Sequence, residues 1–545
     1  MKPATRQLLK YIGLALAGLI LLALGFGVYI YSLIPKPTGK PIQLQTFLFE
    51  KPSMLNYTRK EFIFASATDL ATLIRERKAT SFEITKAHLA QIKNYNFRYN
   101  ALIWLREEEA LREAQMADEA VSRGDSTGTL HGVPVTVKEM FWVKGSPSTM
   151  NAKMFGFVAP EDGPLVRQLK KAGAIILGTT NVPYMLADYQ TFGEVYPVGN
   201  NPYDTSRTPG GSTGGGAAAV SAGFSALELG SDLGGSIRIP SAFCGLYGLK
   251  PSFGLTNITQ GVGPDTINQF NHFALASAGP LARNPEDIEL MWEVLKKAEP
   301  DPRFQIKKDY PTSPPKLLTQ YRVAWIDEYP YRGGTIKSGS DVKASIKHLV
   351  DSLQGRGLMV IQGAPDLYDE MTQSFLASFA AIMMQGQHWV MRKLFGMSMR
   401  GMDDKTGNFD AFYQSLNDVS DEAWEKIQTQ RNVLIEKWEL FFKDHDVLIC
   451  PITYGPAFTK CKTGEEIQGG DQKIPYMDYV GFASIFNATG HPCMVIPMGL
   501  NQDGLPIAIQ LVGKYYSETD LIRFAREIKS FTPGFIKPNI PYSIK

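Results

Sequence analysis

Short apolar runs alternate with amphipathic stretches along most of the chain. Thr80 and Glu83 form a capping box, which predicts that a helix begins here and continues through His88. The spacing of apolar and charged positions predicts a second helix over Glu107–Arg123. The apolar and β-branched run Val133–Lys138 predicts a strand. Such alternation of helices and strands is typical of an α/β fold.

The same alternation continues toward the C-terminus. The further elements that the pattern predicts are, in order, a helix over 162–173, strands over 174–177 and 322–326, a helix that ends before Gly355, a strand over 358–362, a helix from Ser420 to about Lys443 and a strand over 447–450. We see no repeat of fixed period, and no long Ser/Gly linker divides the chain after Thr68. We therefore expect one large catalytic domain over residues 55–545.

The segment Ile12–Ile34 departs from this pattern because it carries no charged residue. A helix of roughly 20 apolar residues crosses a bilayer, so the run predicts one transmembrane helix, with the lipid bilayer as a partner through residues 12–34. A cleaved signal peptide is the alternative, although its apolar part is usually shorter. The Lys and Arg residues around the segment favour a cytoplasmic N-terminus. We therefore expect a membrane anchor and linker over residues 1–40 and a catalytic domain on the exported side.

Composition and charge narrow the class of protein further. The 545 residues are 44% hydrophobic, and 56 Lys and Arg against 54 Asp and Glu leave a formal net charge of +2. With so small a net charge, the protein has no strong positive electrostatic potential that would attract nucleic acid, so we expect no nucleic-acid partner. The four cysteines form no CxxC pair and have no His at ligand spacing, and no motif implies a metal or an organic cofactor. We expect no cofactor, and the sequence leaves a homodimer open.

Two glycine-rich motifs lie close together in the first half of the chain. Gly-Gly-Ser-x-Gly-Gly occupies residues 210–215, and Gly-x-Asp-x-Gly-Gly-Ser occupies residues 230–236. Upstream, GVPVTVKE at 132–139 places a lysine at the end of an apolar strand. Three further blocks accompany them: GAIILGTTN at 173–181, GPLAR at 279–283 and FNATGHPCMVIPMG at 486–499.

This set of motifs resembles the amidase signature family of serine hydrolases. Together with the apolar N-terminal segment, it resembles the membrane-anchored fatty-acid amide hydrolases in particular. The resemblance covers about three quarters of the globular part and is weakest between about Pro300 and Asp444. It implies an α/β amidase signature fold, with a mixed central β-sheet covered by helices on both faces and one N-terminal transmembrane helix.

The residues themselves favour a lysine base. A serine hydroxyl needs a neighbouring base to take its proton. None of the seven histidines lies in a GxSxG elbow or another serine-histidine motif. Lys138 ends an apolar strand, where desolvation favours the neutral amine that can accept a proton. A surface lysine at a strand end is the alternative, and the two nearby glycine-serine motifs argue against it.

The resemblance assigns a role to each member of a Ser-Ser-Lys triad. Ser236 attacks the carbonyl carbon, and Ser212 relays the proton between Ser236 and Lys138. In the family, the peptide bond before the first serine of the glycine loop is cis, and Gly211 makes that turn sterically accessible. Because Ser212 precedes an Ala-rich stretch, we also expect it at a helix N-terminus, where it acts as a cap or as part of the relay.

The turn that carries the nucleophile provides the remaining candidates. Backbone amides of this turn form the expected oxyanion hole, from Leu233, Gly234, Gly235 and Ser236. Asp232 and Arg238 flank the nucleophile, and we interpret them as an orienting ion pair rather than as proton-transfer groups. Thr213 departs from the family pattern, which commonly repeats serine here, but it keeps a hydroxyl group.

The substrate is the least defined part of the prediction. The Met-rich and aromatic stretch Met371–Met402 is a candidate lining for an acyl-chain pocket, because methionine adapts to apolar ligands, although core packing explains such residues equally well. The leading hypothesis is a membrane-anchored amidase that hydrolyses apolar acyl or aryl amides. The alternatives are a glutaminase-type subunit of an amidotransferase and a non-catalytic amidase-like binding protein.

Overall fold

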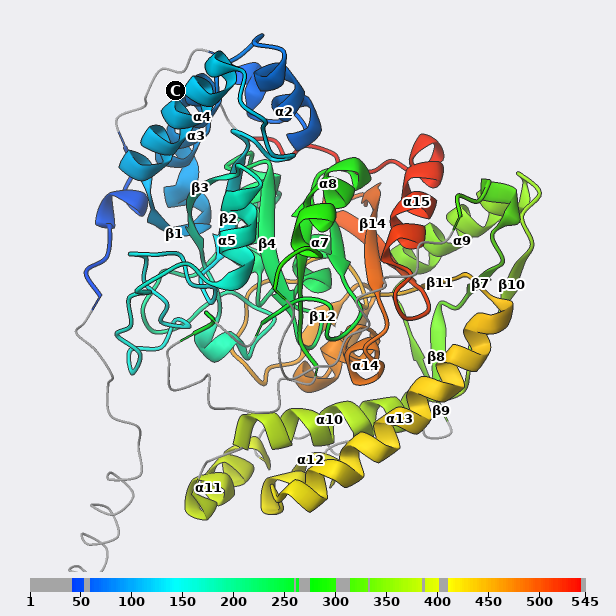
Figure 1. The fold of residues 1–545 in the computed structure, drawn as a ribbon. Coiled ribbons are helices and arrows are strands. Elements are labelled where there is room, and N and C mark those ends of the chain that lie inside the picture. The colour runs from blue at the N-terminus through cyan, green and yellow to red at the C-terminus, as the bar shows by residue number, and fades with distance from the viewer. Residues whose placement is uncertain are drawn as a thin grey trace, which may run out of the picture.

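The computed structural model describes residues 42–52, 59–258, 261–263, 275–299, 314–331, 334–384, 388–400 and 410–540. Within these residues, an eleven-stranded sheet has the order β1-β3-β2-β4-β6-β5-β14-β15-β11-β7-β10 (Figure 1). Its strands are β1 (Leu102–Leu105), β2 (Pro134–Lys138), β3 (Ile175–Thr180), β4 (Leu227–Asp232), β5 (Tyr247–Lys250), β6 (Ser277–Ala282), β7 (Val323–Trp325), β10 (Val360–Gln362), β11 (Val447–Cys450), β14 (Cys493–Leu500) and β15 (Pro506–Val512). Two small hairpins pair β8 (Glu328–Tyr331) with β9 (Gly334–Lys337) and β12 (Ile467–Gly469) with β13 (Gln472–Ile474).

The sheet is mixed, as the resemblance to the amidase signature family implies. β2 lies between β3 and β4 and runs parallel to both. β4 then pairs with β6 in antiparallel fashion, and β14 pairs with both β5 and β15 in the same way. The carboxyl ends of β2 and β4 therefore lie at one edge of the sheet, where the loops that follow them meet.

Fourteen α-helices lie among the described residues. They are α2 (Ala67–Arg75), α3 (Ser81–Tyr99), α4 (Glu107–Arg123), α5 (Pro164–Lys171), α6 (Gly214–Ser221), α7 (Arg238–Phe243), α8 (Pro285–Leu295), α9 (Ser340–Gln354), α10 (Tyr368–Met384), α11 (Trp389–Arg400), α12 (Asp410–Asn417), α13 (Asp421–Asp444), α14 (Gly481–Thr489) and α15 (Glu518–Ile528). Figure 1 shows α10 to α13 below the edge of the sheet, where α10 packs against α14.

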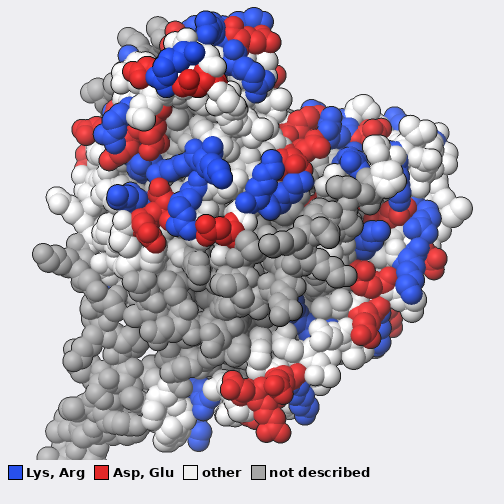
Figure 2. All heavy atoms as spheres, viewed as in Figure 1, with Lys and Arg blue, Asp and Glu red and all other residues white. Residues whose placement is uncertain are grey.

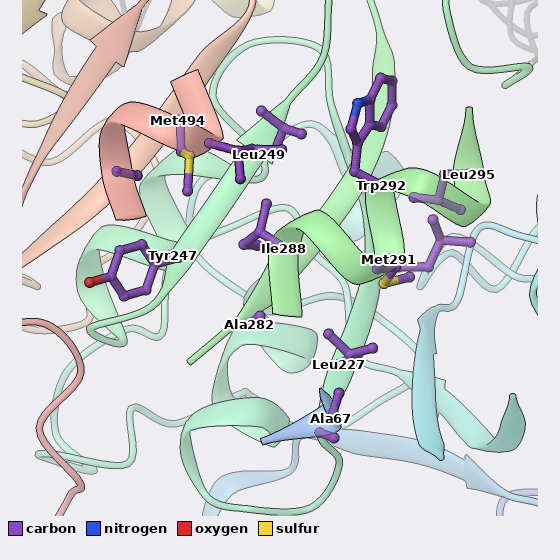
Figure 3. Close-up of a cluster of buried hydrophobic side chains, with 14 of the residues drawn as sticks. Ala67, Leu227, Tyr247, Leu249, Ala282, Ile288, Met291, Trp292, Leu295 and Met494 are labelled. Carbon is purple, nitrogen blue, oxygen red and sulfur yellow. The ribbon is translucent and has the colours of Figure 1, made fainter. Parts of the chain in front are cut away.

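Different helices cover the two faces of the sheet around β4. Leu227 of β4 packs with Ile288 and Met291 of α8, and Figure 3 shows these side chains turned toward one another. Strand alternation turns the next residue of β4, Glu228, to the opposite face, where it meets Gly216 of α6. One face is thus an apolar core, whereas the other buries polar groups beside α6.

The local predictions agree well with the structure. Thr80 caps α3 and forms the predicted capping box with Glu83, although this helix continues well beyond His88 to Tyr99. The charged helix Glu107–Arg123 and the strand Val447–Cys450 have the predicted bounds. Proline begins both α5 and the strand β2, so these elements start a residue or two later than predicted.

The prediction of a single-pass membrane protein is wrong. Residues 12–34 lie outside the described residues. Within the described ranges, no helix is long and apolar enough to cross a membrane. The longest, α13, has 24 residues, but it carries charged side chains along its length, and charges are costly in a bilayer core. We therefore withdraw the membrane localisation and the exported catalytic domain, and neither a bilayer nor a homodimer partner has support in this part of the chain.

Candidate active site

The sheet edge at the carboxyl ends of β2 and β4 brings the predicted triad together. Lys138 is the last residue of β2. Ser236 lies in the turn between β4 and α7, and Ser212 lies just before α6. The two loops are joined by a hydrogen bond of 3.1 Å from the backbone N–H of Thr213 to the carbonyl of Ser236. Residues that are distant in sequence therefore share one small region.

Lys138 is fully buried and contacts two hydroxyl groups. Its Nζ donates to Oγ of Ser212 at 2.7 Å and to Oγ of Ser231 at 2.9 Å. Burial lowers the pKa of Lys138 to about 7, although nearby carboxyl groups act against this effect. A lysine with such a pKa has a large neutral fraction near neutral pH, so it can accept a proton there.

Ser212 follows a cis peptide bond from Gly211, in agreement with the family pattern. A Cβ atom at Gly211 would lie 2.6 Å from the carbonyl oxygen of Asp188, so glycine is required for this close approach. Thr213, not Ser212, is the N-cap residue of α6, and no side chain caps this helix. The Ser212 hydroxyl is therefore directed to Lys138 and not to the helix N-terminus.

Ser236 is more accessible than the other two members of the predicted triad. It is partly exposed, whereas Lys138 and Ser212 are buried. Gly235, directly before it, has a positive φ of 111°, and a Cβ atom there would lie 2.7 Å from Cβ of Ala483. Glycine thus allows the tight turn that presents the serine hydroxyl at the surface of the site.

The N–H groups of this turn divide into two sets. The N–H of Gly235 donates to Oδ1 of Asp232 at 2.8 Å, so it is already occupied. Among the described residues, no acceptor is found for the N–H groups of Leu233, Gly234 and Ser236. Of the four predicted oxyanion-hole residues, these three keep an N–H that can bind a developing oxyanion.

Asp232 and Arg238 form a buried ion pair, with Nε of Arg238 2.9 Å from Oδ2 of Asp232. Burial alone would raise the pKa of Asp232, but Arg238 outweighs burial and holds this pKa well below its usual range. The guanidinium also donates to four groups on other elements: the carbonyl of Ala483 at 2.7 Å, Oε1 of Gln510 at 3.0 Å, Oδ1 of Asn487 at 2.6 Å and Sγ of Cys493 at 3.8 Å. The pair thus ties the nucleophile turn to α14 and β15.

Sequence reasoning missed Ser231. Its Oγ accepts from Lys138 and donates to Sδ of Met140 at 2.9 Å. Thr213 also reaches this residue, since its Oγ1 donates to the carbonyl of Ser231 at 3.2 Å. Ser231 is the unspecified residue of the Gly-x-Asp part of the second motif. Its position directly before Asp232, at the end of β4, was the one signal in the sequence that it lies at the site.

An aromatic cluster lies over the nucleophile turn. A Cβ atom at Gly234 would lie 3.0 Å from Cζ of Phe375, so this ring touches the turn. Phe375 on α10 stacks on Phe379 at 5.9 Å between ring centroids, and Leu233 packs against the same cluster. Within the predicted Met-rich stretch, Met371 packs in the core beside Trp438. The described part of this stretch therefore meets the site through phenylalanine.

The described residues contain no group of three or more His, Cys, Asp or Glu side chains that could hold a metal ion. The site brings together the hydroxyl groups of Ser212, Ser231 and Ser236, a buried lysine amine and backbone N–H groups. This set of groups is suited to acyl transfer by a serine nucleophile.

The sequence of this chain is similar to those of several known proteins. The sequence profile of the family described as Amidase matches residues 83–522. The chain is 30% identical over 462 residues to the indoleacetamide hydrolase of Bradyrhizobium diazoefficiens, covering 83% of this chain and 84% of that protein. It is 28% identical over 516 residues to the A subunit of the glutamyl-tRNA(Gln) amidotransferase of Bdellovibrio bacteriovorus, covering 87% and 99% respectively.

Solved structures show the same fold at lower sequence identity. The 6-aminohexanoate cyclic dimer hydrolase complexed with substrate has a TM-score of 0.70 at 23% identity, covering 86% of this chain and 98% of that one. Fatty acid amide hydrolase has a TM-score of 0.68 at 21% identity, covering 87% and 86%. The profile match over most of the chain and the indoleacetamide hydrolase relative show that this chain belongs to the amidase signature family of hydrolases, which act on carbon-nitrogen amide bonds.

Proposed function

We propose that this chain hydrolyses carboxylic amides with an apolar acyl or aryl group, through an acyl-enzyme on Ser236. The observation that carries the proposal is the hydrogen bond of 2.7 Å between the buried Lys138 amine and Ser212, beside the turn that bears Ser236. The catalytic domain proposed over residues 55–545 contains all three residues. The family profile, over 83–522, falls within it.

The reaction proceeds by two acyl transfers. In the neutral form, Lys138 takes a proton from Ser212, which takes the proton of Ser236 as that oxygen attacks the amide carbonyl carbon. The N–H groups of Leu233, Gly234 and Ser236 bind the oxyanion of the tetrahedral intermediate. The C–N bond then breaks, the relayed proton passes to the leaving amine, and an ester to Ser236 remains. Water attacks this ester by the same proton relay and releases the carboxylic acid.

The aromatic cluster at the turn supports an apolar acyl or aryl group. Leu233, Phe375 and Phe379 pack in one cluster that touches the turn. An apolar substrate group that packs there loses contact with water, at about 25 cal/mol for each Å² of apolar surface buried. Indoleacetamide, after which one relative is named, is an amide with an aryl group of this kind.

The alternative function is that of a glutaminase-type amidotransferase subunit. It is favoured by the amidotransferase relative, which this chain matches over 99% of the relative's length at 28% identity. Among the described residues on the face shown in Figure 2, Lys and Arg side chains are interspersed with Asp and Glu and form no continuous basic surface of the kind that tRNA phosphates attract. The two functions differ in their substrates, because glutaminase activity requires glutamine.

The decisive experiment compares wild type with Ser236→Ala on a panel of amides that contains glutamine, indoleacetamide and acyl amides of increasing chain length. We expect wild type to hydrolyse the apolar amides and to be labelled by a fluorophosphonate, and Ser236→Ala to lose both activities while remaining folded. Hydrolysis of glutamine alone would favour the amidotransferase function. Normal turnover by Ser236→Ala would show that the nucleophile is wrong, and a folded wild type without labelling or turnover would favour a binding protein.

A further inference from the structure

A buried sulfur atom lies two residues beyond Lys138 and has no place in the proton relay described above. Met140 belongs to the turn that follows β2, and its side chain is buried. A hydrogen bond of 3.0 Å from the N–H of Phe141 to the carbonyl of Lys138 closes this turn, and the carbonyl of Met140 accepts the N–H of Gly263 at 2.7 Å. Backbone contacts therefore fix the position of Met140 relative to the lysine.

The thioether of Met140 is connected to the lysine through Ser231. Sδ of Met140 accepts a hydrogen bond of 2.9 Å from Oγ of Ser231, and the same oxygen lies 2.9 Å from Nζ of Lys138. A thioether sulfur carries no hydrogen and can only accept, whereas a hydroxyl group has one hydrogen to donate. The hydroxyl proton of Ser231 is therefore directed to the sulfur, and the oxygen presents a lone pair to Lys138.

Three oxygen atoms of the described residues surround Nζ of Lys138. They are Oγ of Ser212 at 2.7 Å, Oγ of Ser231 at 2.9 Å and the carbonyl oxygen of Ser231 at 3.4 Å. An ammonium group has three protons, one for each of these oxygens. A neutral amine has only two protons and one lone pair, so one of the three contacts has to reverse and donate to the nitrogen.

The partners of Ser231 decide which contact reverses. Its carbonyl oxygen has no proton, and its hydroxyl proton is already donated to Met140. The hydroxyl group of Ser212 is the one that remains able to donate to Nζ. The lone pair of the neutral amine therefore faces Ser212, which is the orientation that a base acting on Ser212 requires.

We propose that Met140 is a positioning residue whose thioether sets the direction of the proton relay, because it holds the Ser231 proton away from the lone pair of Lys138. This proposal rests on the proposed function, since it requires Lys138 to accept the proton of Ser212. As Ser236 attacks, its proton passes to Ser212 and the proton of Ser212 passes to Nζ. The three protons of the resulting ammonium group again meet the three oxygens. Met140 itself touches no reacting atom.

Without the sulfur, the hydroxyl group of Ser231 gains a second orientation. It can rotate and donate to Nζ, which occupies the lone pair of Lys138 and turns an N–H of the amine toward Ser212. No proton can leave Ser212 for the lysine until the hydroxyl group rotates back. A hydrogen bond of ordinary net strength separates the two orientations, so we expect a loss of rate of about 3- to 10-fold.

The test is a double-mutant cycle on the full-length chain, in which kcat and KM for one amide are measured for wild type, Met140→Leu, Ser231→Ala and the double variant. Leucine keeps the volume of methionine and removes the acceptor. Met140→Leu should lower kcat by about 3- to 10-fold and leave KM nearly unchanged. In the Ser231→Ala background no hydroxyl group can be misdirected, so Met140→Leu should have no further effect. The matched control is Met291→Leu, in the apolar core of α8, which should follow wild type.

Equal losses from Met140→Leu in the two backgrounds would overturn the proposal, because a packing defect does not depend on the hydroxyl group of Ser231. An unchanged kcat in folded Met140→Leu would overturn it as well. If Met140→Leu does not fold, norleucine at position 140 serves in its place, because it replaces only the sulfur by a methylene group, and the same outcomes decide. Absence of fluorophosphonate labelling at Ser236 in wild type would instead refute the proposed function itself.

Discussion

The two ends of strand β4 each bury a carboxyl group, and the two groups are held in opposite charge states. At the carboxyl end, Asp232 pairs with Arg238 and accepts the N–H of Gly235, and its pKa lies well below the usual range. Nearer the start of the strand, Glu228 has only the hydroxyl groups of Thr136 and Thr180 to favour its ionised form apart from Lys138, and burial raises its pKa to about 8. The difference teaches that neighbouring groups, and not burial, decide whether a buried acid is ionised.

Lys138 lies between these two environments. The Asp232 end has a permanent charge that orders the turn of Ser236, because the carboxylate binds backbone N–H groups of that turn. At the Glu228 end, burial raises the pKa of the carboxyl group to about 8, so this group places no charge beside the lysine at neutral pH. The four predictions below test this division of roles, from the largest expected effect to the smallest.

Lys138→Met should have the largest effect. Amide hydrolysis should fall by about 10²- to 10⁴-fold, the usual contribution of a general base, with a residual rate that grows with pH as hydroxide replaces the amine. Because the folded-state pKa of Lys138 is lowered from 10.5 to about 7, the folded state loses stability as pH falls from the unfolded value to the folded value, and this loss is complete in acid. The variant should therefore unfold at higher temperature than wild type in acid. Lys144→Met, at an exposed position, should change neither property, and a stable, fully active Lys138→Met would refute the assignment.

Arg238→Met should leave Asp232 as an uncompensated buried charge. Removal of one partner of a buried pair costs about 3 to 5 kcal/mol, so the denaturant midpoint should fall sharply at neutral pH. The matched control is Arg322→Met, because Arg322 is 45% exposed and its partner Asp446 keeps a second ion pair with Lys316. That change should cost less than about 1 kcal/mol. Equal losses in the two variants would contradict the contrast between buried and exposed pairs.

Glu228→Gln should change stability only above acid pH. The folded-state pKa of Glu228 is raised from 4.5 to about 8. Its favourable contribution is therefore complete below the unfolded value and is lost as pH rises through the folded value. At alkaline pH the variant should be more stable than wild type by roughly 1 to 3 kcal/mol, the cost of an unsatisfied buried group. The unfolding temperature of both proteins, measured across pH, gives this difference. If the difference between them did not change with pH, ionisation of Glu228 would not destabilise the folded state.

Ser231→Ala should have the smallest effect. It removes one of the two hydroxyl groups that accept hydrogen bonds from Lys138 and leaves Ser212 in place. We expect a stability loss of about 0.5 to 1.5 kcal/mol, the net value of a typical hydrogen bond, and a loss of rate well below that of Lys138→Met. A rate loss as large as that of Lys138→Met would make Ser231 a full member of the proton relay.

The helices, the strands and the triad residues could be predicted from the sequence because local sequence patterns indicate them. The capping box of Thr80 and Glu83, the charged helix over Glu107–Arg123 and the β-branched strand that ends at Lys138 all formed as predicted. Hydrogen bonding and side-chain period operate over a few residues, so a short window contains the required information.

Other features could not be predicted because they depend on contacts between distant segments. Asn487, Gln510 and Phe375 meet the nucleophile turn only through the packing of α14, β15 and α10. For the apolar segment over 12–34, the sequence pattern led instead to a prediction that went too far. Its composition supported a membrane localisation that the described part of the chain does not bear out.

By itself, the sequence determined the α/β fold, the family and the three residues of the proposed triad, since glycine-serine motifs and strand patterns are local and specific. The charge states around that triad were decided only by the tertiary structure. Asp232 and Glu228 are both acids on one buried strand, and no local pattern distinguishes them. The folded chain brings Arg238 to Asp232, whereas it brings the hydroxyl groups of Thr136 and Thr180 and the bare backbone of Gly216 to Glu228. Because electrostatic free energy depends on distance and desolvation, these spatial neighbours determine the protonation of each acid.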